Sequence, residues 1–163
     1  MKTLKFKEQV ELLLEVLPFV AKETCFALKG GTAINLFVRD FPRLSVDIDL
    51  TYLGDEPRDE ALLLVEQALY RIKSDLESKI KGIKIFPSRK EGLPNDIKLF
   101  ISKNEVQIKI EASPIQRGVL LPTESRSLTK KAVDEFNLEI DFKIVNLGDL
   151  YGGKIVAALD RQH

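Results

Sequence analysis

Two neighbouring stretches decide how this chain folds: Leu28-Lys29-Gly30-Gly31-Thr32-Ala33-Ile34 and, shortly after it, Val46-Asp47-Ile48-Asp49-Leu50. The first stretch joins an apolar run, residues 25–29, to a pattern that predicts a helix through about residue 38, with Thr32 as its cap. The second alternates apolar and acidic residues, which is typical of a strand. The sequence therefore predicts a strand, a Gly-Gly turn, a helix and a second strand in succession.

Asp47 and Asp49 share one face of the predicted strand, because side chains two residues apart point the same way. Two carboxylates side by side repel each other, and burying them is costly unless a cation neutralises them. Mg²⁺ suits this position, since it binds one or two carboxylates together with phosphate oxygens and water. Charge alternation on an exposed strand is the commoner explanation of Asp-x-Asp, so the pair alone does not establish a metal site.

A later run, residues 106–112, repeats this alternation. It places Lys109 and Glu111 on one face and apolar residues on the other. If the two strands are neighbours, Glu111 supplies a third carboxylate. Three carboxylates can hold two metal ions about 4 Å apart, the arrangement that serves phosphoryl and nucleotidyl transfer. We therefore predict a catalytic site of Asp47, Asp49 and Glu111 that binds Mg²⁺ or Mn²⁺.

The Gly-Gly turn offers a place for phosphate. Gly30 and Gly31 would let the backbone approach a triphosphate closely, and the following helix start would offer N–H groups. Thr32 adds a hydroxyl donor. A plain tight turn is the commoner explanation of a lone Gly-Gly pair, and the two best-known phosphate-binding fingerprints are absent from the sequence.

The remaining patterns predict a single α+β domain, residues 1–163, with a central mixed sheet flanked by helices. Helical periodicity recurs in residues 5–23, 60–80 and 146–161, and Pro18 is expected to interrupt or kink the first of these. Apolar runs typical of strands are residues 83–86, 97–101, 106–112 and 142–145. Residues 113–141 give no clear pattern.

Composition excludes several classes of protein. Lys plus Arg number 25 and Asp plus Glu number 25, which argues against an extended basic coat for nucleic acid but leaves room for a local basic groove. The single cysteine forms no intrachain disulfide and fits a reducing compartment. No run reaches the ~20 apolar residues of a membrane span, so we expect a cytoplasmic protein without a membrane partner. The sequence shows no obvious stacking platform of aromatic residues.

The combination of motifs is more specific than its parts. An apolar strand, Gly-Gly, a short helix and Asp-x-Asp on the next strand resembles the DNA polymerase β-like nucleotidyltransferase superfamily. The longer string that ends in Arg43-x-Ser45-x-Asp47-Ile48-Asp49-Leu50 is similar to one branch, the AbiEii/AbiGii toxin family, the nucleotidyltransferase half of abortive-infection toxin–antitoxin systems. The resemblance covers roughly residues 25–161.

The resemblance implies a role for each matching position. Phosphate would be bound by Gly30, Gly31 and Thr32, metal by Asp47 and Asp49, and Glu111 would assist deprotonation of the acceptor. The same resemblance assigns four further residues to the nucleotide side of the site: Arg43, Ser45, Lys109 and Lys154. Solvated lysines at 109 and 154, and a surface ion pair at Arg43, remain open alternatives. The implied partners are a nucleoside triphosphate, an RNA acceptor such as tRNA, and a cognate antitoxin protein.

One departure from the family keeps other functions open. The family continues beyond the segment that resembles Asp160-Arg161-Gln162-His163 into a further helical region, which we expect this chain to lack. A catalytically inactive module that binds nucleotide and metal, or docks an antitoxin, is therefore the main alternative. A glycosyltransferase, which also uses Asp-x-Asp with a divalent metal, is a third possibility.

Overall fold

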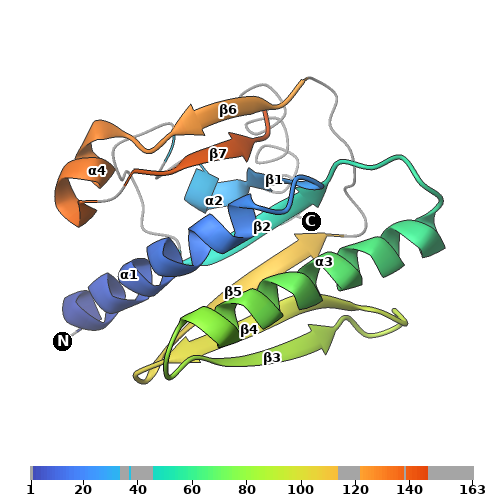
Figure 1. The fold of residues 1–163 in the computed structure, drawn as a ribbon, viewed down its shortest axis with the longest axis horizontal. Helices are drawn as coiled ribbons and strands as arrows, with labels where there is room; N and C mark the ends of the chain where they lie inside the picture. Colours follow the sequence, from blue (N-terminus) through green and yellow to red (C-terminus); the bar gives the residue numbers. More distant parts are fainter. Residues whose placement is uncertain (1, 34–36, 38–45, 114–121, 138, 147–163) are drawn as a thin grey trace, which may run out of the picture.

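The computed structural model describes residues 2–33, 37, 46–113, 122–137 and 139–146 (Figure 1). In chain order, the elements are α1 (Lys2–Ala21), β1 (Phe26–Lys29), α2 (Gly30–Ala33), β2 (Asp47–Tyr52), α3 (Arg58–Lys79), β3 (Lys84–Arg89), β4 (Asp96–Lys103), β5 (Val106–Ser113), β6 (Glu124–Ser127), α4 (Lys130–Phe136) and β7 (Asp141–Ile144).

The described strands form one mixed sheet of seven strands, in the order β3-β4-β5-β2-β1-β7-β6. Strand β2 runs parallel to β5, and β1 runs parallel to β7. The other neighbouring pairs are antiparallel. The predicted α+β class with a central mixed sheet is therefore confirmed.

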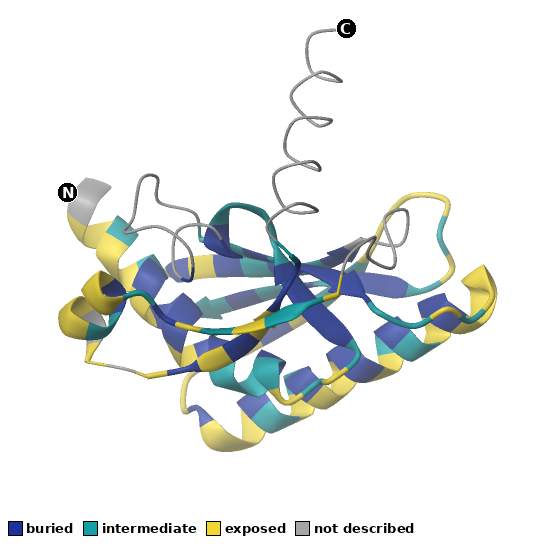
Figure 2. Ribbon diagram, turned by 90° about the horizontal axis from the view of Figure 1, so that it is seen from above, coloured by how far each residue is buried: buried dark blue, intermediate teal, exposed yellow. Residues whose placement is uncertain are grey.

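Helices α1 and α3 lie along the same face of this sheet, where α1 packs against β5 and α3 against β4 (Figure 1). The alternation of each strand sends its apolar residues to that face. Ile48 and Leu50 of β2 and Ile108 and Ile110 of β5 are buried there. Buried and exposed residues also alternate along α3, as Figure 2 shows. The polar residues of β2 and β5 consequently point to the opposite face.

Two predictions about the N-terminal helices were wrong. Helix α1 runs unbroken from Lys2 to Ala21 with Pro18 inside it. Pro18 lies in the last turn, so few residues follow that could be deflected. Thr32 is not a cap, because α2 already begins at Gly30. Whether this helix reaches residue 38 lies outside the described residues.

The predicted strands are all present, but two elements within residues 113–141 were missed. Strand β6 is short and polar, so its sequence carries little apolar alternation. Helix α4 has a recognisable start, since the side chain of Thr129 accepts a hydrogen bond from the backbone N–H of Ala132. It ends at Asn137, which adopts a left-handed conformation. The predicted helix over residues 146–161 falls almost wholly outside the described residues.

A polar cluster ties α3 to the start of β4. The hydroxyl of Tyr70 donates a hydrogen bond to Asp96 Oδ2 at 2.5 Å. The backbone N–H of Asp96 donates to the carboxylate of Glu66 at 2.6 Å, and Arg89 lies 3.4 Å from Asp96 Oδ1. The hydrogen bond to Asp96 raises the pKa of Tyr70 to about 12. The cluster thus fixes the helix to the outer strands of the sheet.

Replacing Tyr70 with phenylalanine tests this tie. We expect the free energy of unfolding to fall by about 1 kcal/mol, because the hydrogen bond from the exposed Tyr70 hydroxyl to the buried Asp96 carboxylate is lost. Urea denaturation measures the change. In an Asp96→Asn background the same substitution should cost less, since the charged acceptor is already gone. Equal costs in both backgrounds would show that the hydroxyl does not act through Asp96.

Candidate functional site

The three acids predicted from the sequence lie on neighbouring strands. In the parallel pairing of β2 with β5, Asp49 stands opposite Glu111 and Asp47 stands opposite Lys109. The expectation that these strands are neighbours is therefore confirmed. Residues opposite each other in register share a face of the sheet, so all four side chains emerge on the face away from α1 and α3.

The register extends this arrangement over four strands. Strand β1 places Lys29 opposite Asp49, and β4 places Lys98 opposite Glu111. We call this line, Lys98–Glu111–Asp49–Lys29, the charged row. Two acids stand at its centre with a lysine at each end, so the row carries its own partial neutralisation.

Lys109 forms ion pairs with two of the acids. Its Nζ atom lies 3.4 Å from Glu111 Oε2 and 3.9 Å from Asp47 Oδ2. Lys98 Nζ lies 3.5 Å from the same oxygen of Glu111. These side chains are partly exposed, so each ion pair contributes little to stability. Their importance is positional, because they bring two ammonium groups to the edge of the three acids.

The electrostatics favour a cation at Asp49. Burial raises the pKa of the Asp49 carboxyl, and the neighbouring Asp47 and Glu111 raise it further, while Lys29 and Lys109 oppose the shift. Burial lowers the pKa of Lys29, against the pull of Asp49 and Glu111. An additional positive charge near Asp49 would relieve both the desolvation and the repulsion.

The donor chemistry of the site suits a hard divalent cation. Three carboxylates emerge on one face of adjacent strands, and Mg²⁺ and Mn²⁺ prefer oxygen ligands. Within the described part of the chain, however, no three acidic, histidine or cysteine side chains are arranged to hold a metal ion. Glu111 instead faces Lys98 and Lys109. Binding a metal would require Glu111 to exchange these partners for the ion.

The Gly-Gly turn lies directly against the acids. Gly30 has a φ of +77°, and a Cβ atom there would lie 2.8 Å from Asp49 Oδ2. Gly31 follows it within α2. The buried side chain of Thr32 donates its hydroxyl to the backbone carbonyl of Asp47, which holds α2 against β2. A phosphate contact from these three residues remains a prediction.

Sequence reasoning did not identify two residues of the charged row, and three of the residues that it did predict lie outside the described residues. Lys29 precedes the Gly-Gly pair and Lys98 lies in a distant apolar run, so only the strand register brings them to the acids. An assumed antiparallel pairing of β1 with β2, which follow each other in the chain, could have identified Lys29 as a neighbour of Asp49. Arg43, Ser45 and Lys154 lie outside the described residues, and their roles remain predictions.

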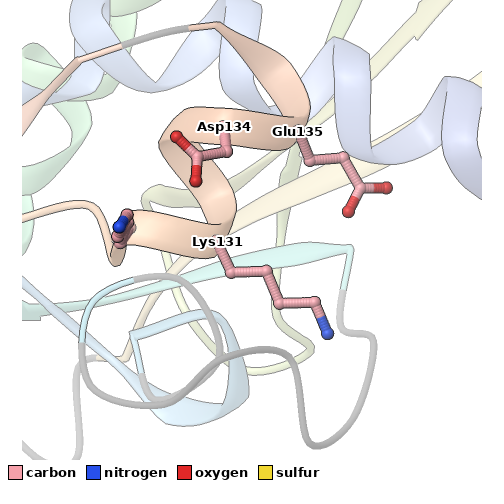
Figure 3. Close-up of a pocket in the computed structure, with 4 residues that line it drawn as sticks. Lys131, Asp134 and Glu135 are labelled. Atoms are coloured by element: carbon pink, nitrogen blue, oxygen red, sulfur yellow. The ribbon is translucent and has the colours of Figure 1, made fainter.

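An open hollow on α4 is a poor candidate for the site. It is lined by Lys130, Lys131, Asp134 and Glu135, and Figure 3 shows the side chains of Lys131 and Glu135 extending from the helix. Its two lysines and two acids balance, and it belongs to a helix near β6 and β7 rather than to β2 or β5. The hollow is therefore best explained as a solvent-exposed face of the helix, with charged side chains on it.

Replacing Asp49 with asparagine should raise the melting temperature at neutral pH without added metal, because it removes a charge that burial and two carboxylates disfavour. In the wild type, the raised pKa means that the folded state binds a proton more readily than the unfolded state. Its stability should therefore rise as the pH falls from neutral through that pKa, and the variant should lose this gain. Melting curves across a pH series in EDTA measure both effects. A variant that melts below the wild type at every pH would contradict the argument.

Comparisons with known proteins agree with this architecture. A family model described as "Nucleotidyl transferase AbiEii toxin, Type IV TA system" matches residues 11–163. No curated protein matches the chain. Among solved structures, MenT4, a nucleotidyltransferase toxin from Mycobacterium tuberculosis H37Rv, is similar with a TM-score of 0.50 and 17% identity. The match covers 84% of this chain and 48% of MenT4, so the chain spans about half the length of that protein. None of the described helices is long and apolar enough to cross a membrane.

Proposed function

The chain belongs to the nucleotidyl transferase AbiEii toxin family of type IV toxin–antitoxin systems, and from this we propose that it transfers a nucleotide from a nucleoside triphosphate to an acceptor hydroxyl at the charged row. The hydroxyl oxygen would bond to the α-phosphorus as the α–β phosphoanhydride bond breaks and pyrophosphate leaves. The observation that supports the proposal most is the register of β2 with β5, which sets Asp49 beside Glu111. Asp47, two residues from Asp49, completes the set of acids on that face.

Asp47, Asp49 and Glu111 would hold Mg²⁺ or Mn²⁺, which when bound supplies positive charge for the triphosphate and lowers the pKa of the acceptor hydroxyl. Glu111 would assist by taking the hydroxyl proton. The raised pKa of Asp49 supports this assignment, because the carboxylates repel one another until a cation joins them.

The chain's own cations would serve the phosphates. Lys109 lies between Asp47 and Glu111, so it could move from these acids to a phosphate oxygen when metal takes its place. Gly30 and Gly31 would let the triphosphate approach the backbone, with Thr32 holding α2 in position. Arg43, Ser45 and Lys154 complete the proposed nucleotide site by resemblance to the family.

We further propose RNA, such as tRNA, as the acceptor, growth arrest as the outcome, and a cognate antitoxin protein as the partner that relieves it. The family's place in type IV toxin–antitoxin systems supports the antitoxin. The cytoplasm, where nucleoside triphosphates and RNA meet, is the proposed location.

Incubation with each labelled nucleoside triphosphate, Mg²⁺ and total RNA tests the proposal. We expect label on RNA from at least one nucleotide, and no label when EDTA removes the metal. Metal-dependent nucleotide binding without transfer would instead support an inactive binding module, which the pairing of Glu111 with two lysines also favours. Consumption of sugar nucleotides alone would point to a glycosyltransferase.

A further inference from the structure

A second line of residues runs across the sheet beside the charged row. The register pairs Phe86 of β3 with Phe100 of β4, Phe100 with Lys109 of β5, and Lys109 with Asp47 of β2. We call this line, Phe86–Phe100–Lys109–Asp47, the aromatic row. It leads straight from the edge of the sheet to the acids, on the face opposite α1 and α3.

The two phenylalanines are accessible on that face. Phe86 is 62% exposed although it lies within a strand, while its neighbour Ile85 is buried on the helix side. Phe100 is half-buried, and Leu99 and Ile101 beside it are buried on the helix side. A single exposed apolar residue needs no explanation. Two aromatic residues that pair directly across neighbouring strands, in a row that leads to a candidate site, form a continuous surface that a ligand can contact.

Lysines flank these rings, and Lys98 also pairs with Glu111 at the border of the acids. Lys84 precedes Phe86 by two residues and is exposed, and Lys98 precedes Phe100 by two residues. The outward positions beside the rings carry no acid until Glu111, which stands next to β2. They are Lys84, Phe86, Ser88, Lys98, Phe100, Ser102, Gln107 and Lys109. Aromatic rings between lysines on a flat sheet suit stacked bases with phosphates alongside.

We propose that this face of β3, β4 and β5 is the docking surface for a single-stranded segment of the acceptor RNA. Bases stack on Phe86 and Phe100, and Lys84 and Lys98 contact the RNA phosphates, while Lys109 at the end of the row serves the nucleoside triphosphate. The inference rests on the proposed function, since the RNA is the acceptor of the transfer. Neighbouring strands lie about 4.8 Å apart, so Phe100 is about 10 Å from Asp47 along the row, close enough for the next nucleotide to reach the acids.

The edge of the sheet argues against the main alternative, a protein partner that adds a strand to β3. Pro87 lies in β3 and has no N–H to donate, and the pairing with β4 is irregular between Ser88 and Arg89. Both features disfavour the addition of another strand at this edge. The face of the sheet, rather than its edge, is therefore the accessible element.

Binding of a fluorescein-labelled single-stranded RNA to the full chain, measured by fluorescence anisotropy, tests the proposal. Phe86→Ala should weaken the affinity about tenfold, the usual loss for one stacking aromatic. Phe86→Trp should keep the affinity, which separates the loss of stacking from misfolding. Leu63→Ala is the matched control, since Leu63 is also an exposed apolar residue, 46% exposed, but lies on α3 on the opposite face. Lys84→Ala should reduce the dependence of affinity on salt.

Two results would overturn the inference. One is RNA binding by Phe86→Ala that equals that of the wild type. The other is a lower mass of Phe86→Ala than of the wild type on light scattering, which would place Phe86 in a contact between proteins. Failure of the proposed function gives a different pattern. If the wild type binds RNA through Phe86 but transfers no nucleotide, the docking surface stands and the transferase proposal falls. If transfer proceeds with an unchanged KM for RNA in Phe86→Ala, the transferase stands and the docking surface falls.

Discussion

Replacing Asp47 with asparagine is expected to lower the rate of nucleotidyl transfer by at least about a hundredfold, the loss that follows removal of one preorganised electrostatic group from an active site. Asparagine keeps the shape of the side chain and removes its charge. Lys109 Nζ lies 3.9 Å from Asp47 Oδ2 and 3.4 Å from Glu111 Oε2. The substitution therefore removes the charge of one of the three acids, and it leaves no cavity in the core. Transfer of labelled nucleotide to RNA at saturating Mg²⁺ measures the effect.

Asp75→Asn is a suitable control for this experiment, because it makes the same chemical change on α3, which covers the other face of the sheet. It should transfer nucleotide at the wild-type rate. Both variants should keep the circular dichroism of the wild type, since neither site is in the apolar core. Wild-type activity in Asp47→Asn would remove Asp47 from the catalytic site.

Replacing Gly30 with alanine should have the second largest effect, because it acts on backbone and site together. The φ of +77° costs a residue with a Cβ atom about 1–2 kcal/mol. The new methyl group would also lie 2.8 Å from Asp49 Oδ2 and must push that carboxylate aside. We expect transfer to fall at least about tenfold, together with a lower free energy of unfolding.

Gly82→Ala separates these two contributions. Gly82 has nearly the same φ, +76°, but nothing lies within 4 Å of the position that its Cβ would take. It should lose comparable stability and keep full activity. If both alanine variants lose activity equally, the effect of Gly30→Ala comes from reduced stability rather than from displacement of Asp49.

Local patterns in the sequence carried most of the fold. Strand β1 was recognisable as a short apolar run and β2 and β5 by their period-two alternation, which also set Asp47 and Asp49 on one face of β2 and Glu111 on one face of β5. Pro18 misled because a proline near a helix end disturbs little. Strand β6, Glu-Ser-Arg-Ser, could not be recognised, since it pairs with β7 at the edge of the sheet without an apolar face of its own.

The neighbours of the acids depend on register, which local patterns do not encode. Lys29 and Lys98 reach the charged row only because β1 pairs with β2 and β4 pairs with β5 at particular residues. Phe86 and Phe100 are likewise distant in the chain, so the sequence showed no stacking platform, although the hairpin of β3 and β4 sets them opposite each other. A shift of one residue in any of these pairings would send the side chains to the other face.

The parallel pairing of β2 with β5 also has a consequence for synthesis. Parallel neighbours cannot be joined by a tight turn, and here the connection contains α3, β3 and β4. A nascent chain on the ribosome that has emerged only as far as Lys103 has exposed Asp47 and Asp49 but not Glu111. Because a domain generally folds as a unit, the three acids can be brought together only after β5 has emerged. Partly made copies that end before β5 would thus lack one of the three acids of the proposed site.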